Sequence, residues 1–180
     1  MSERAGRVGR TATLSQAEEL RPCGRRPTPG PPDGHAVAMY VSVRVDARRR
    51  WALREEVGRL RARESRRVFD PSVHVGILGG GRTGFVLRAK DRPALDAALR
   101  IEVACRLLAD SPRQWRTAWL VRAGTPESHD LDLQWLSAAR MGFGIHDRVL
   151  DGCFVVTRTG WRDVVTGERR EWTRLRLEGR

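Results

Sequence analysis

The sequence predicts a single mixed α/β domain of the α+β type, with one central mixed sheet, about three helices and a C-terminal β-hairpin. Short segments rich in β-branched residues recur along the chain and are separated by glycine-containing turns. Longer segments place apolar residues three and four positions apart, the spacing of a helix with one buried face. The 180 residues, 31% charged and 40% apolar, have the length and balance of one globular domain.

The N-terminal part of the chain differs from the rest in composition. Residues 1–37 are expected to form a disordered tail, because residues 21–34 are too rich in proline and glycine for a helix or a strand. The globular domain is expected over residues 38–180 and opens with a half-buried strand at residues 38–45. Because Met39 stands where this strand begins, one hypothesis is that it is the native start and that the tail is not native.

Three helices are predicted from apolar periodicity. The first covers residues 48–67, where apolar residues at spacings of four and three form one stripe. The second covers residues 92–109, with Pro93 in its first turn, and is expected to be the central buried helix. The third covers residues 129–141, with Ser128 as its N-cap and acidic residues in its first turn.

The strands are predicted where β-branched and aromatic residues cluster between turns. After the first strand they are expected at residues 72–78, 84–89, 117–123, 151–158, 161–165 and 171–177. Residues 79–84 spell G-x-G-x-x-G, but a dinucleotide fingerprint needs a helix directly after it. A strand follows here, and no lysine follows the last glycine, so the segment is interpreted as a hairpin turn.

The residue types needed for familiar catalytic sites are missing or scattered. Cys23, Cys105 and Cys153 form no C-x-x-C pair, and Cys105 and Cys153 are expected to be buried small hydrophobic residues rather than redox groups. No serine stands in G-x-S-x-G, and no nucleophile has a base beside it in the sequence. The chain is therefore predicted to be no enzyme and to hold no metal and no cofactor. With no apolar run long enough for a membrane and no secretory signal, it is expected to be cytoplasmic.

One metal site remains open as an alternative. His129, Asp132 and His146 offer ligands that a catalytic metal accepts, and folding would have to bring them together. The competing interpretation is structural, because an acid in the first turn of a helix already stabilises the helix dipole.

The positive charge admits two interpretations. The formal net charge is +12, and Lys90 is the only lysine among 34 basic residues. Arginine binds phosphate bidentately, which favours nucleic acid as a partner. Such a skew toward arginine also occurs wherever a genome is very rich in G and C. The composition alone does not distinguish phosphate binding from a genomic bias toward arginine.

The C-terminal segment carries the first candidate binding surface. In an extended strand over residues 170–177, one face would carry Arg170, Trp172, Arg174 and Arg176, which suits phosphate contact and base stacking. The competing interpretation is an edge strand that charge protects from aggregation. Arg48, Arg49 and Arg50, at the start of the first predicted helix, are the second candidates.

Two resemblances bear on the role of the chain. Residues 90–177, with the segments Ala118-Trp119-Leu120-Val121-Arg122 and Phe154-Val155-Val156-Thr157-Arg158, resemble uncharacterised proteins of actinobacterial plasmids and integrative elements. This resemblance implies an accessory role in maintenance or transfer. The same stretch resembles the metalloprotease-like domain of the RadC DNA-repair family, with Asp130 or Asp132 at the place of the family's aspartate. The family's H-x-H is absent after the strand, which implies a fold without the zinc.

The function expected from these observations is that of a non-enzymatic accessory protein of a mobile genetic element, with a basic surface that contacts DNA or RNA through non-specific electrostatics. Two alternatives stay open. One is a protein–protein interaction module with a tryptophan-rich surface, in which the arginine content reflects the genome. The other is a degenerate or unorthodox metal-dependent hydrolase-like domain.

Overall fold

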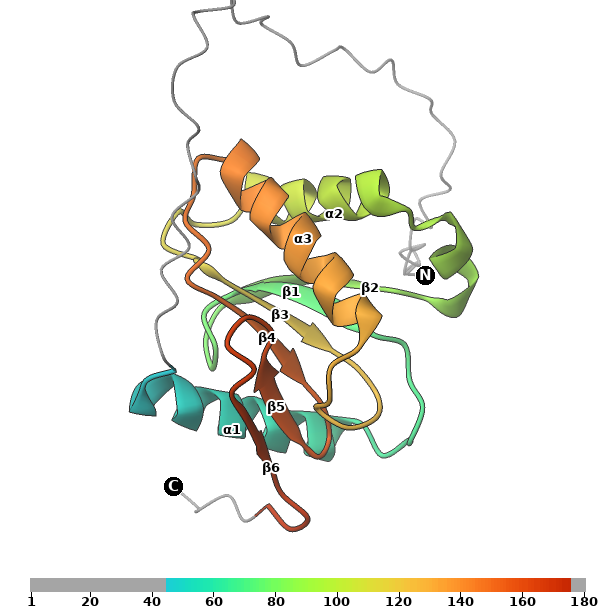
Figure 1. Ribbon diagram of the computed structural model, residues 1–180, viewed down its shortest axis with the longest axis vertical. Coiled ribbons are helices and arrows are strands. Elements are labelled where there is room, and N and C mark those ends of the chain that lie inside the picture. Colours follow the sequence, from blue (N-terminus) through green and yellow to red (C-terminus); the bar gives the residue numbers. More distant parts are fainter. Residues whose placement is uncertain (1–44, 176–180) are drawn as a thin grey trace, which may run out of the picture. The chain divides into compact units, whose positions relative to one another are not determined.

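A mixed six-stranded sheet with helices on both faces makes up residues 45–175, which the computed structural model describes apart from the side chains of residues 92–94 (Figure 1). The predicted strand at residues 38–45 lies almost entirely outside the described residues, as do the tail and the end of the chain. In chain order the elements are α1 (Ala47–Arg63), β1 (Ser72–Gly76), β2 (Arg82–Val86), a 3-10 helix η1 (Ala89–Ala94), α2 (Ala97–Ala109), β3 (Thr117–Val121), α3 (Asp130–Ile145), β4 (Gly152–Val156), β5 (Gly160–Asp163) and β6 (Arg169–Glu171). The predicted class, mixed with three helices and a C-terminal hairpin, is confirmed.

The strands follow the order β2-β1-β3-β4-β5-β6 across the sheet. Only the central pair, β3 and β4, is parallel. Parallel neighbours need a long crossover, and α3 supplies it. The other sequential pairs are hairpins, and β1 pairs with β3 antiparallel across the connection that contains α2.

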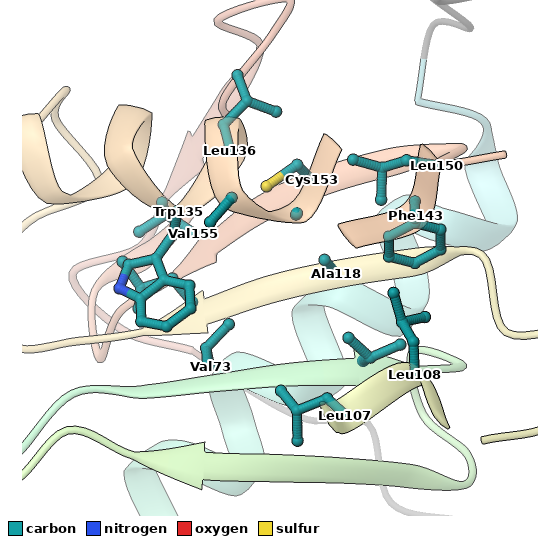
Figure 2. Close-up of a cluster of buried hydrophobic side chains, with 14 of the residues drawn as sticks. Val73, Leu107, Leu108, Ala118, Trp135, Leu136, Phe143, Leu150, Cys153 and Val155 are labelled. Carbon is teal, nitrogen blue, oxygen red and sulfur yellow. The ribbon is translucent and has the colours of Figure 1, made fainter. Parts of the chain in front are cut away.

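One face of the sheet packs against α2 and α3. The cluster shown in Figure 2 joins side chains from the sheet, such as Val73 and Val155, to Leu108 of α2 and to Trp135 and Phe143 of α3. The two helices cross closely, since a Cβ atom on Gly142 would lie 2.9 Å from the Cβ atom of Ala104. Burial of this apolar surface is the main force that holds the two helices on the sheet.

The opposite face of the sheet packs against α1 (Figure 1). Strand alternation divides β3 between the two layers, because Trp119 belongs to the cluster under α1 whereas Leu120 belongs to the cluster under α2 and α3. The predicted stripe on α1 is confirmed, since Leu53, Val57 and Leu60 are all buried. They pack there with further residues of the sheet, chiefly Val121, Phe154, Val156 and Trp161.

α1 is shorter than predicted, ending at Arg63 instead of residue 67. The carboxylate of Glu64 accepts hydrogen bonds from the backbone nitrogen of Arg66 at 3.0 Å and from its side chain at 2.8 and 2.9 Å. This local arrangement competes with the next helical turn and replaces it with a loop.

The second helix also begins at a different residue from the one predicted. Residues 89–94 form η1, and α2 begins only at Ala97, where the side chain of Asp96 caps it by accepting from the nitrogen of Leu99 at 2.8 Å. Ala98 and Leu99, in the first turn of α2, are exposed. α2 is therefore not a central buried helix, since it covers one face of the sheet and shows its other side to solvent.

The third helix is longer than predicted and starts from a different cap. His129, not Ser128, is the N-cap: its Nδ1 accepts from the nitrogen of Leu131, and its own nitrogen donates to Asp132. Helical hydrogen bonding continues four residues beyond the predicted end, to Ile145.

The largest correction concerns the last strand. β6 contains three residues and ends at Glu171, so residues 172–175 do not continue the predicted alternation. Trp172 and Leu175 both pack against the cluster under α1, which an extended strand would not allow for positions three apart. The hairpin itself is confirmed, with Gly167 at φ 75° in its turn.

Candidate nucleic-acid interface

The residues predicted to bind nucleic acid do not form one row. Arg170 and Arg174 are exposed, whereas Trp172 is half-buried and Arg176 lies outside the described residues. The carbonyl of Trp172 accepts from Arg61 at 2.6 Å, which places it at the C-terminal end of α1. The second group, at Arg48, lies near the other end of this helix, about 20 Å from Arg61 at 1.5 Å per residue.

Two of the three arginines at the start of α1 are already engaged. Arg49 donates to the carbonyl of Asp151 at 3.2 Å, and Arg50 forms an ion pair with Glu168 at 2.9 Å. Arg48 is exposed and has no acidic partner among residues 45–175. Of this predicted group, only Arg48 has a guanidinium free to bind a phosphate.

Three segments that are distant in the sequence meet at the C-terminal end of α1. Arg61 donates to the carbonyls of Arg158, in the β4–β5 turn, and of Trp172. Arg158 in turn donates to the carbonyls of Ser65 and Arg66 at 2.9 and 3.2 Å. These segments carry six arginines, called the basic end below, namely Arg61, Arg63, Arg66, Arg67, Arg158 and Arg174.

The acids near the basic end neutralise only part of it. Glu64 is held by Arg66, whose hydrogen bonds lower the pKa of this carboxyl to about 2. Within the described part of the chain, Arg63, Arg67 and Arg174 are exposed and have no hydrogen bond or ion pair to an acid. An arginine without an acidic partner can bind a phosphate without first losing an ion pair.

The tryptophans are distributed differently from the expectation of a tryptophan-rich surface. Trp119, Trp135 and Trp161 are core residues, and Trp51 is the one tryptophan that is mostly exposed, at 55%. It lies three residues after Arg48 on the solvent side of α1. The exposure of Trp51 could have been predicted from the sequence, because Trp51 falls outside the apolar stripe of the helix.

A pocket of about 390 Å³ opens beside the basic end, between α1 and strands β1 and β2. Ser72 and His74 lie in it, with Ser72 Oγ and His74 Nε2 sharing a hydrogen bond of 2.9 Å. His74 points away from Val73 and Val75, which belong to the cluster on the other face of the sheet. Burial, followed by the charges of Arg82 and Arg63, lowers the pKa of His74 to about 4, so the ring is neutral at pH 7.

The glycine turn beside this pocket is structural. The buried carboxylate of Glu56 accepts from Arg59 at 2.8 Å, from Arg82 at 2.7 Å and from the nitrogen of Gly79 at 3.2 Å. The strand β2 begins directly after the turn, which confirms the interpretation as a hairpin rather than a dinucleotide fingerprint.

The residues of the alternative metal site are not brought together. His129 and His146 cap opposite ends of α3, about 24 Å apart along the helix. Asp132 is buried and bound to Arg122, whose Nε and Nη2 donate to its two oxygens at 2.7 and 2.8 Å. Over residues 45–175 no group of three metal-ligating side chains is present. A guanidinium thus holds the aspartate that a metal site at these residues would need.

The cysteines that can be placed behave as structural residues. Cys153 is buried in the cluster of Figure 2, and burial raises the pKa of its thiol to about 12. Cys105 is half-buried on α2, and burial raises the pKa of its thiol as well. Neither thiol is in the deprotonated form that a nucleophile requires.

Comparisons of the chain with family models, with curated proteins and with solved structures give no match. None of the helices within residues 45–175 is long and apolar enough to cross a bilayer. A function has therefore to be inferred from the residues and their arrangement.

Proposed function

We propose that this chain is a non-enzymatic accessory protein that binds nucleic acid through the basic end. The observation that carries the proposal is the set of three exposed guanidinium groups without acidic partners, on Arg63, Arg67 and Arg174. Hydrogen bonds from Arg61 and Arg158 to backbone carbonyls hold the segments that bear them together. A cluster held in this way binds phosphates at a smaller entropic cost than arginines on a mobile segment.

The outer side of α1 extends this surface. Arg48 and Trp51 lie along the helix from the basic end, and both are exposed. An exposed indole next to cations suits stacking with the bases of a single strand. Maintenance or transfer of a mobile element, which the resemblance of residues 90–177 implies, would use such binding without sequence preference.

The test is the salt dependence of DNA binding by the full chain, measured by fluorescence anisotropy at 50 to 200 mM salt. The variant R63Q/R67Q/R174Q removes the three unpaired cations of the basic end. We expect weaker binding and a slope of log K against log salt that is smaller in magnitude by about 2 for a single strand. The matched control R88Q/R106Q/R113Q removes the same charge from exposed arginines after β2, on α2 and before β3.

Equal changes in slope for the two triple variants would show that binding is not localised at the basic end. If the unmodified chain binds no nucleic acid at 50 mM salt, the proposal is wrong. A stable partner in a pull-down from nuclease-treated lysate would then favour the interaction module. That module would not present a tryptophan-rich surface, because three of the six tryptophans are core residues.

A further inference from the structure

The pocket beside the basic end exists because α1 leaves part of the sheet uncovered. Among the described residues the backbone of α1 lies closest to β4 and β5, and no other described helix covers β1 and the edge strand β2 on this face. The register places Ser72 opposite Val86 and His74 opposite Gly84, and these residues form the floor. The volume of about 390 Å³ lies in the range of small-molecule sites.

The floor is polar, uncharged and held in place. The ring of His74 stacks on Trp119 at a centroid distance of 5.4 Å and lies over Gly84, where any Cβ atom would collide with it. Its Nε2 is bonded to Ser72, and its Nδ1 is buried against Gly84. The hydroxyl of Ser72 has further hydrogen-bonding capacity beyond this one bond, so it is the polar group of the floor that a ligand can bond to.

The walls combine apolar side chains with four charged ones. Leu60, Phe69 and Val86 supply apolar surface for a flat ring. The charge of Arg82 is balanced by Glu56, and that of Glu64 by Arg66. The carboxylate of Asp70 also lines the pocket, and it interacts with Arg66 and has a further interaction of its own. Arg63 is the lining cation without an acidic partner among the described residues, and it also belongs to the basic end.

We propose that this pocket receives one nucleotide, with its base between the apolar walls, a ring nitrogen or carbonyl bonded to Ser72, and its phosphate at Arg63. The complement of a neutral polar floor, apolar walls and one cation without an acidic partner is a neutral heteroaromatic ring that carries a phosphate. Two sources have this chemistry, namely one unstacked base of a single strand and a free nucleoside monophosphate. The first rests on the proposed function, because the basic end would hold the neighbouring phosphates.

The test fills the pocket without changing charge. Val86 is 51% exposed and lines the pocket, and Val149 is 49% exposed after α3, so V86W and V149W are a matched pair. Binding of a fluorescent single strand, of a duplex and of a nucleoside monophosphate to the full chain is measured for both, after equal thermal midpoints have been established. We expect V86W to weaken single-strand binding by about tenfold or more, and to leave duplex affinity and the salt slope unchanged.

A second variant keeps the inference testable if V86W does not fold. S72A removes one hydroxyl from the floor and should weaken single-strand binding about threefold, again without effect on the duplex. If V86W and S72A match V149W for both the strand and the monophosphate, the pocket is not a nucleotide site, and the basic end is unaffected by that result. If the chain binds no strand but binds the monophosphate in a V86W-sensitive way, the pocket serves free nucleotides and only the proposed function is wrong.

Discussion

Arg122 illustrates how a single arginine can differ from the many others in this chain. Its guanidinium is buried and donates to both oxygens of Asp132 and to the carbonyls of Ala123, Thr125 and Glu127. These bonds tie the loop after β3 to the first turn of α3. Because the pair is buried and fully hydrogen-bonded, removal of one partner leaves the other charge buried without compensation and lowers the stability of the fold.

We expect R122M to lower the free energy of unfolding by about 3–5 kcal/mol, since it leaves the carboxylate of Asp132 buried without its counter-charge. Urea denaturation of the full chain measures this loss. The double variant R122M/D132L should recover part of it, because both charges are then absent. As a control, R169Q breaks the exposed pair with Glu127 and should cost no more than about 1 kcal/mol. A loss for R122M as small as that of R169Q would contradict the structural role.

At the scale of elements, the start of α3 shows how capping is decided by geometry. Serine is a favoured N-cap and stands at position 128, so the sequence favoured Ser128. The structure instead uses His129, whose ring accepts from Leu131 while Asp132 accepts from the backbone of His129. The bidentate bond between Asp132 and Arg122 determines where the first turn lies, and the cap follows from that position.

This arrangement makes a prediction with a neighbouring control. H129A should destabilise the chain by about 1 kcal/mol, the usual cost of losing a side-chain cap, and S128A should leave the free energy of unfolding nearly unchanged. Both are measured by urea denaturation. Equal losses for the two variants, or a larger loss for S128A, would show that the helix starts from the serine.

At the scale of the whole molecule, the net charge of +12 works against folding. Like charges repel in the compact state, and salt screens this repulsion. The repulsion is expected to be largest where unpaired cations gather, and among the described residues the segments that meet at the basic end carry three of them. A surface that repels itself in this way is one that a polyanion stabilises.

The thermal midpoint of the full chain should therefore rise between 20 and 300 mM NaCl. R63Q/R67Q/R174Q should show a smaller rise than R88Q/R106Q/R113Q, because it removes clustered charges rather than dispersed ones. Differential scanning fluorimetry without nucleic acid measures both. An equal rise in the two variants would mean that no repulsion is concentrated at the basic end.

The sequence alone determined the class of fold, the number of helices and most of the strands. These properties depend on residues that are close together in the chain. Examples are the apolar stripe of Leu53, Val57 and Leu60, which predicts α1, and the glycines of the turn that joins β1 to β2. Side-chain direction within a strand was equally local, as the placement of His74 away from Val73 and Val75 shows. The ends of elements were predicted less accurately. A local hydrogen bond, such as the one that the backbone nitrogen of Arg66 donates to Glu64, competes with the formation of another helical turn.

Only the tertiary structure decided which charges and aromatic residues are available to a partner. Arg49 and Arg50 looked as accessible as Arg48 in the sequence, yet their partners, Asp151 and Glu168, are more than 100 residues away. The same long-range packing buries three tryptophans and leaves Trp51 in solvent. The basic end and its pocket exist for this reason, since availability depends on what folding places beside a residue and not on its neighbours in the chain.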